Sequence, residues 1–85
     1  YDVQLQLLKA NSLRDTRRYK EAEEIYEYVI DLNKTKPEAY LNRAKNFTLL
    51  GKVDRAKEAI EATLKLNYKY KEIIEMDKDL KLCLN

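Results

Sequence analysis

Residues 39–67 read AYLNRAKNFTLLGKVDRAKEAIEATLKLN. The segment holds two stretches of helix-forming residues in which apolar side chains recur at intervals of three and four, the spacing that places them on one face of an α-helix. Gly51, the single glycine of the chain, stands between the two stretches, where it suits the left-handed backbone that ends many helices. The segment therefore predicts two helices joined by a tight turn.

The same helical pair occurs earlier in the chain, at a constant shift in numbering. Residues 37–70 align with residues 3–36 without a gap. Small residues recur at positions where two helix backbones come close, and large apolar residues three and four positions away fill the space around them. The small matched pairs are Ala10 with Ala44 and Ala22 with Ala56, and the large ones include Leu7 with Leu41, Leu13 with Phe47, and Tyr26 with Ile60. The chain is therefore expected to contain two tandem helical hairpins.

The composition and the positions of Gly and Pro favour an all-α fold of about five helices. One Gly, one Pro and 38% charged residues are typical of helices and not of strands and tight hairpins. Pro37 suits a first helical turn, where its missing N–H is not needed. The sequence DTRRY at residues 15–19 makes the turn equivalent to that at Gly51 without glycine, so a looser or strained turn is expected there. The predicted helices span residues 2–15, 19–33, 37–50, 53–67 and 70–83.

The 85 residues are enough for one small domain. We expect a single domain over residues 1–85, with repeat one at 3–36, repeat two at 37–70, and a helix at 71–85 that covers the apolar flank of the last repeat. An alternative is that this last segment begins a third, truncated repeat. Because the chain begins with Tyr and not Met, we expect it to be a fragment of a longer protein.

A 34-residue period made of two helices resembles the tetratricopeptide repeat (TPR). The matching residues of the second repeat are Tyr40, Arg43, Ala44, Phe47, Gly51, Ala56, Ile60 and Leu64. Those of the first are Gln6, Lys9, Ala10, Leu13, Ala22, Tyr26 and Ile30. The resemblance implies a short right-handed α-solenoid of tandem hairpins and a function in protein-protein interaction, with no chemistry performed.

Several function classes find no support in the sequence. The chain has no His, and Cys83 is its single cysteine, so the usual zinc sites and an intrachain disulfide are excluded. The acidic residues near the carboxyl end lack the glycine and loop pattern of a calcium site. The net charge of +2 comes from interleaved signs, which is typical of a solvated surface and not of a nucleic-acid interface. We expect no catalytic residue, cofactor or metal.

The resemblance places a candidate binding site on the first helix of each repeat, because these helices line the concave face of TPR arrays. The pattern puts Gln4 and Arg14 of the first repeat and Glu38 of the second on this face. The residues predicted to bind a partner peptide in the concave groove are Leu7, Leu8, Asn11, Leu41, Asn42, Lys45 and Leu49.

Asn11 and Asn42 match two asparagines of the carboxylate clamp with which co-chaperone TPR domains hold the acidic tails of chaperones. The cationic residues of that clamp are missing, because Leu7, Glu72 and Met76 stand in their places. A carboxylate would therefore lose its charge-assisted partners, and the usual chaperone-tail binding is not expected. The groove instead suits a peptide segment with apolar anchors, whose backbone the asparagine amides could bind.

Other interpretations stay open at this stage. Leu5, Leu7 and Leu8 at the amino-terminal edge could pack against an upstream helix instead of lining a groove. An alternative function is that of a structural scaffold or a self-association module within a longer repeat array. RNA binding is disfavoured by the interleaved acidic residues. No apolar run is long enough for membrane insertion, and we expect a cytoplasmic location.

Overall fold

The computed structural model describes residues 2–84, which contain helices and no strand. Tyr1 and Asn85, the two ends of the expected domain, lie outside the described residues. The elements are α1 (Val3–Asp15), α2 (Tyr19–Leu32), α3 (Pro37–Leu49), α4 (Val53–Leu66), α5 (Tyr70–Met76) and a short 3-10 helix, η1 (Leu80–Leu84). The all-α class is confirmed, and the first four helices lie within one residue of their predicted bounds.

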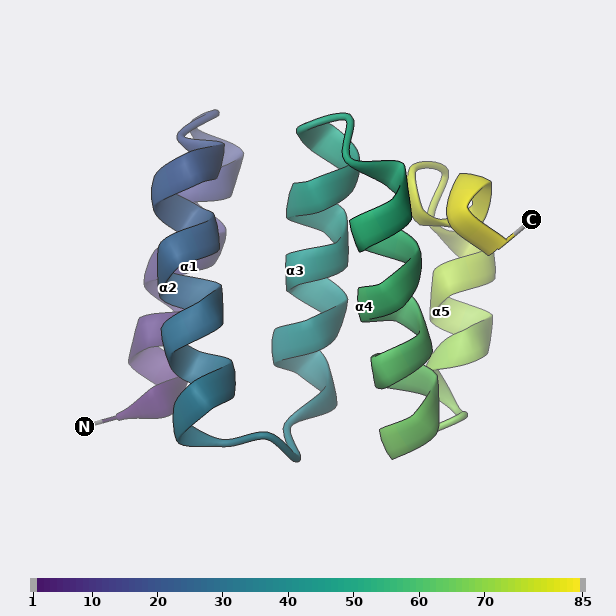
Figure 1. Cartoon of the computed structure of the whole chain (residues 1–85), viewed down its shortest axis with the longest axis horizontal. Helices are drawn as coiled ribbons and strands as arrows, with labels where there is room; N and C mark the ends of the chain where they lie inside the picture. Colours follow the sequence, from purple (N-terminus) through teal and green to yellow (C-terminus); the bar gives the residue numbers. More distant parts are fainter. Residues whose placement is uncertain (1, 85) are drawn as a thin grey trace.

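The helices form two hairpins that stack side by side (Figure 1). Helix α1 packs against α2 and α3 against α4, while the contact between the hairpins is made mainly by α2 and α3. The last segment, α5 and η1, lies beyond α4 at the far end of the stack. The result is an elongated molecule of 34 × 26 × 19 Å.

Each hairpin has its own cluster of buried apolar residues. The first joins Leu7, Ala10, Ala22, Tyr26, Val29 and Ile30 with Ala39 of the second hairpin. The second joins Leu41, Ala44, Phe47, Ala56, Ala59 and Ile60 with residues of the last segment. The four alanines that the sequence places at close helix crossings, Ala10, Ala22, Ala44 and Ala56, are completely buried. Their missing side-chain bulk is therefore what lets the helices approach.

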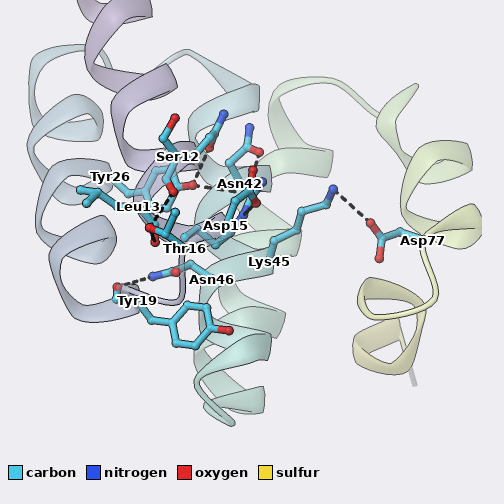
Figure 2. A network of polar contacts seen from close by, with 12 residues as sticks. Ser12, Leu13, Asp15, Thr16, Tyr19, Tyr26, Asn42, Lys45, Asn46 and Asp77 are labelled. Carbon is cyan, nitrogen blue, oxygen red and sulfur yellow. Dashed lines mark hydrogen bonds and ion pairs between the residues drawn. The ribbon is translucent and has the colours of Figure 1, made fainter.

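The contact between the hairpins is polar as well as apolar. Arg43 on α3 donates from Nε to Oε1 of Glu23 on α2 at 2.7 Å, and its guanidinium lies 5.1 Å from the ring centre of Phe47. The buried side chain of Asn46 donates from Nδ2 to the carbonyl oxygen of Tyr19 at 2.8 Å, as Figure 2 shows. The charged group of Arg43 is therefore held at the contact between the hairpins by the carboxylate of Glu23 and the ring of Phe47.

The expectation of one helix over residues 70–83 is wrong. Helix α5 ends at Met76, and Oδ1 of Asp77 accepts hydrogen bonds from the amides of Asp79 at 2.9 Å and Leu80 at 3.1 Å. A side chain that satisfies nearby amides in this way offers the backbone an alternative to the helical hydrogen bonds. In addition, Lys78 takes the position of Ala44 when the repeat alignment is extended, so a third helix could not make the close crossing that the repeat requires.

The broken segment still packs on the second hairpin. Ile74, Leu80 and Cys83 are buried in the second cluster, and η1 contacts both α3 and α4. Cys83 is therefore a core residue, whose Sγ lies 3.5 Å from Oγ1 of Thr48. Leu82 remains largely exposed, because the short 3-10 helix presents a single face to the hairpin.

Candidate functional site

Two of the seven residues predicted to bind a peptide lie in the core. Leu7 has 2% of its surface exposed and belongs to the first cluster with Tyr26 and Val29. Leu41 has 8% exposed and belongs to the second cluster with Phe47. The prediction is corrected for both, because the face of each first helix that packs against its own hairpin partner needs these large side chains.

Within residues 2–84, helices α1, α3 and α5 carry five exposed large apolar residues, of which Leu5 and Ile73 were not among the positions discussed for the groove. Leu8 on α1, Leu49 on α3 and Met76 on α5 have 51%, 46% and 80% of their surface exposed. Leu8 and Leu49 are among the residues predicted from the sequence to bind a peptide. Met76 is one of the residues that stand where the carboxylate clamp of co-chaperone TPR domains would need a cation. These side chains are free to contact a ligand.

Asn42 joins the two hairpins through its side chain. Its Oδ1 accepts a hydrogen bond from Nη1 of Arg14 on α1 at 3.0 Å, and its Nδ2 donates to the carbonyl oxygen of Glu38 at 2.8 Å. Figure 2 shows Asn42 among the residues of this polar network. The amide is therefore held in one orientation, with one N–H and one acceptor position left for a ligand.

Asn11 lies in the same network on the α1 side. Its Oδ1 accepts a hydrogen bond from the hydroxyl of Tyr26, which in turn lies 3.4 Å from Nη1 of Arg14. Burial raises the pKa of Tyr26 to about 12, against the opposing effect of the nearby Arg14 charge. Asn11, Tyr26 and Arg14 are thus fixed relative to one another, and the hydroxyl of Tyr26 keeps its proton at neutral pH.

Glu38 connects α3 to the start of α5. The hydroxyl of Tyr70 donates to Oε1 of Glu38 at 2.7 Å, and Nζ of Lys36 lies 3.3 Å from Oε2. The hydrogen bond from Tyr70 lowers the pKa of Glu38, with a smaller contribution from Lys36. The same hydrogen bond raises the pKa of Tyr70 to about 12. Glu38 is therefore an ionised carboxylate with both oxygens occupied.

Lys45, the one cation among the seven predicted residues, points toward the last segment. Its Nζ lies 3.2 Å from Oδ2 of Asp77, and Figure 2 shows the side chain reaching across from α3. Partial burial would raise the pKa of Asp77, but the amides of Leu80 and Asp79 and the charge of Lys45 together hold it below its ordinary value. Lys45 is thus neutralised by Asp77, so it offers a ligand little unpaired positive charge.

The candidate site combines polar side chains held by hydrogen bonds, those of Asn11 and Asn42, with exposed apolar side chains. Its polar atoms can form hydrogen bonds with a peptide backbone, and Leu8, Leu49 and Met76 can bury apolar side chains of a partner. Tyr70 and Asp77 were missing from the sequence prediction. The sequence carried no signal for them. The repeat alignment pairs Tyr70 with Lys36 and Asp77 with Arg43, and neither of these residues has the same role.

A separate hollow of about 160 Å³ lies between α3 and α4. It is lined by Tyr40, Arg43, Phe47, Arg55, Glu58, Ala59 and Ala62. None of the predicted peptide-binding residues takes part in it.

Within residues 2–84, no helix combines the length and the apolar character needed to cross a membrane.

The comparisons with known proteins agree with this architecture. A search of curated proteins finds no match to the chain. A family model described as tetratricopeptide repeat matches residues 13–74, which is well over half of the sequence and extends from the end of α1 into α5. The chain therefore belongs to the tetratricopeptide repeat family.

Proposed function

We propose that the chain is a non-enzymatic interaction module that binds a peptide segment of another protein along α1, α3 and α5. Repeats of this family are generally non-catalytic modules for protein-protein interaction or scaffolding, which supports the class of function. The proposal is carried by two observations: α1, α3 and α5 each present an exposed apolar side chain, Leu8, Leu49 and Met76, and the amides of Asn11 and Asn42 on α1 and α3 are held by hydrogen bonds.

The chemistry of the ligand follows from the charges on α3 and α5. Glu38 is ionised, Lys45 is already paired with Asp77, and Glu72 lies exposed on α5. An acidic segment would meet these carboxylates, whereas Lys45, the cation predicted for the groove, is already paired with Asp77. The ligand is therefore a segment with two or three apolar anchors and no cluster of acidic residues. An acidic chaperone-tail peptide should show negligible binding by calorimetry, and low-micromolar affinity for it would refute this part of the proposal.

The test uses substitutions on the exposed surface, because Leu41 is buried and its replacement would disturb the core. The tagged chain and a Leu49→Glu/Met76→Glu variant are compared in pull-downs from cells of the source organism, with quantitative mass spectrometry. Leu32→Glu is the matched control, because Leu32 has a similar exposed fraction, 49%, but lies on the second helix α2. Unfolding curves establish that all three proteins fold.

We expect a partner that the native chain and the Leu32→Glu control capture equally and the double variant loses. A synthetic peptide from that partner should then bind with the same dependence on Leu49 and Met76. If the double variant captures the same proteins as the native chain, the groove does not bind them and the proposal fails.

Self-association as part of a scaffold is the second candidate. It is favoured by Leu5 and Leu82, which are more than 60% exposed near the two ends of the stack. Light scattering over a range of concentrations separates the candidates. A mass that rises with concentration, and falls when Leu5→Ser and Leu82→Ser are introduced, supports the scaffold, whereas a constant monomer mass contradicts it.

A further inference from the structure

The hollow between α3 and α4 has a buried floor and walls that are held in place. Phe47 and Ala59 are its buried lining residues, and Tyr40 and Arg43 are half-buried beside them. The hydroxyl of Tyr40 donates to the carbonyl oxygen of Lys34 at 3.0 Å. Arg43 is fixed by its ion pair with α2 and by the ring of Phe47. A ligand that enters the hollow would therefore not have to order these side chains.

At two positions that line the hollow, the second repeat has small residues where the first repeat has large ones. The repeat alignment carries Ala59 and Ala62 of α4 onto Ile25 and Tyr28 of α2. This face of the second repeat thus carries less side-chain volume than the same face of the first. The difference includes one phenol ring, which a ligand could bring back.

The volume of the hollow suits a single ring. Drug-sized ligands occupy pockets of about 300–1,000 Å³, whereas an engineered apolar cavity of about 150 Å³ is enough to bind benzene. The hollow, at about 160 Å³, is close to the second figure. Protein interfaces often concentrate their binding energy in one anchor side chain that fills such a pocket, and Tyr is among the commonest anchors.

The rim of the hollow supplies one donor and one acceptor. Arg55 and Glu58 are its exposed lining residues and lie one turn apart on α4. Neither takes part in an ion pair among residues 2–84, and Arg43 is already neutralised by Glu23. Because the two rim charges have opposite signs, they favour an uncharged group that accepts from a guanidinium and donates to a carboxylate. A phenol hydroxyl does both.

We propose that this hollow binds the side chain of a tyrosine that a partner protein presents, with its hydroxyl between Arg55 and Glu58. The ring would contact Phe47 and Ala59 on the floor, and it would lie beside the guanidinium of Arg43. None of the residues predicted for the groove lines the hollow, so it is a second contact site for a partner.

The probe for this site is N-acetyltyrosinamide, which carries the phenol ring on a peptide unit. Its binding is followed through the methyl signals of Ala59 and Ala62 in a chain labelled with ¹³C at the alanine methyl groups. N-acetylphenylalaninamide measures what the hydroxyl contributes, and p-cresol presents the ring without the peptide unit. Ala62→Tyr supplies the tyrosine of the first repeat from within the chain and should block the hollow. Leu66→Tyr is the matched control, because Leu66 is exposed on α4 and does not line the hollow.

We expect saturable shifts of both methyl signals with a dissociation constant in the millimolar range. The phenylalanine compound should bind about two- to fivefold more weakly, because it cannot form the hydrogen bonds of the hydroxyl. Ala62→Tyr should abolish binding, while Leu66→Tyr and Leu49→Glu/Met76→Glu should leave it unchanged, so the outcome is independent of the groove. Arg55→Ala/Glu58→Ala, which changes only the exposed rim, should make the two compounds bind equally, and it decides the test if Ala62→Tyr does not fold.

Three results with folded proteins would overturn the proposal. The methyl signals of Ala59 and Ala62 would not move, or the two compounds would bind the native chain equally, or Ala62→Tyr would bind as the native chain does. Binding of p-cresol without binding of N-acetyltyrosinamide would assign the hollow to a free phenol, and it would overturn the proposal too.

Discussion

Arg17 and Gly51 occupy the same position of the two repeats and share one backbone conformation, the left-handed turn that ends the first helix of each hairpin. Their φ angles are 67° and 79°. In both turns the next residue donates its amide to the carbonyl five residues earlier, from Arg18 to Leu13 at 2.8 Å and from Lys52 to Phe47 at 2.9 Å. Glycine adopts this conformation without strain, whereas an L side chain at Arg17 destabilises it by about 1 kcal/mol.

Arg17→Gly should therefore stabilise the protein. The Arg17 side chain is exposed and forms no hydrogen bond or ion pair with residues 2–84, so its removal costs no contact. We expect the free energy of unfolding, measured in urea, to rise by about 0.5–1 kcal/mol.

Gly51→Ala is the converse test of the same turn. A Cβ at Gly51 would meet no atom within 4 Å, so any loss reports the backbone conformation alone. We expect a loss of about 1 kcal/mol. Equal stability of Arg17→Gly and the native chain would show that the positive φ at Arg17 carries no strain.

Ala56→Leu should destabilise the second hairpin by overpacking. Ala44 and Ala56 are both completely buried where α3 and α4 cross, so an isobutyl side chain has no space there. We expect a loss of about 1–3 kcal/mol and a lower melting temperature. Ala62→Leu is the matched control on the same helix, because Ala62 lines the hollow of about 160 Å³ and a larger side chain can occupy it. Equal losses for the two variants would show that the crossing does not require a small residue.

Asp77→Ala should loosen the junction between α5 and η1. The substitution removes the acceptor of the Asp79 and Leu80 amides and the partner of Lys45, which we expect to cost about 1 kcal/mol. Hydrogen exchange should accelerate at the amides of Asp79 and Leu80. An unchanged exchange rate would show that Asp77 does not hold this junction.

Asp77→Asn isolates the charge of the same residue, because an amide oxygen can still accept both hydrogen bonds. The pKa of Asp77 is lowered in the fold, so its carboxylate contributes stability above the unfolded value of 3.8, and this contribution is lost as the pH falls through the folded pKa. The native chain should exceed Asp77→Asn in stability at neutral pH by less than about 1 kcal/mol, and the difference should disappear in acid. A difference that persists at low pH would assign the effect to something other than the charge.

Tyr70→Phe should produce the opposite pH dependence. The hydrogen bond to Glu38 raises the pKa of Tyr70 from 10.0 to about 12, so the contribution of Tyr70 to stability is complete below the unfolded value and is lost as the pH rises toward 12. The stability difference between the native chain and Tyr70→Phe should be constant from neutral pH up to 10.0 and decline above it.

Glu38→Gln provides the control for this pair. It replaces the charged acceptor with a neutral one, so the ionisation of Tyr70, followed by tyrosinate absorbance, should move from about 12 back toward 10.0. If the absorbance titration is the same in Glu38→Gln and the native chain, the carboxylate does not control the pKa of Tyr70.

The sequence by itself determined the repeat and most of the helices. The pairing of the hairpins depends on alanines that recur at the helix crossings of both repeats. The helix boundaries depend on local residues, such as Pro37 at a helix start and Gly51 after a helix end. The same alignment predicted a looser or strained turn at residues 15–19, because Gly51 has no glycine counterpart there, and the structure shows the strained form, with a positive φ at Arg17. These features require no knowledge of distant contacts.

Tertiary structure decided which predicted residues are available to a ligand. Leu7 and Leu41 have the spacing predicted for the inner face, yet both are buried. A helix that packs against two neighbouring helices buries more of its surface than the single apolar face that the sequence pattern predicts. Lys45 is neutralised by Asp77 because the last segment breaks at that residue and folds back over α3 and α4. Tyr70 reaches Glu38 across 32 positions of the chain. Such partners lie at separations that the repeat pattern does not encode, because they depend on how the nonrepeating last segment packs against the repeats.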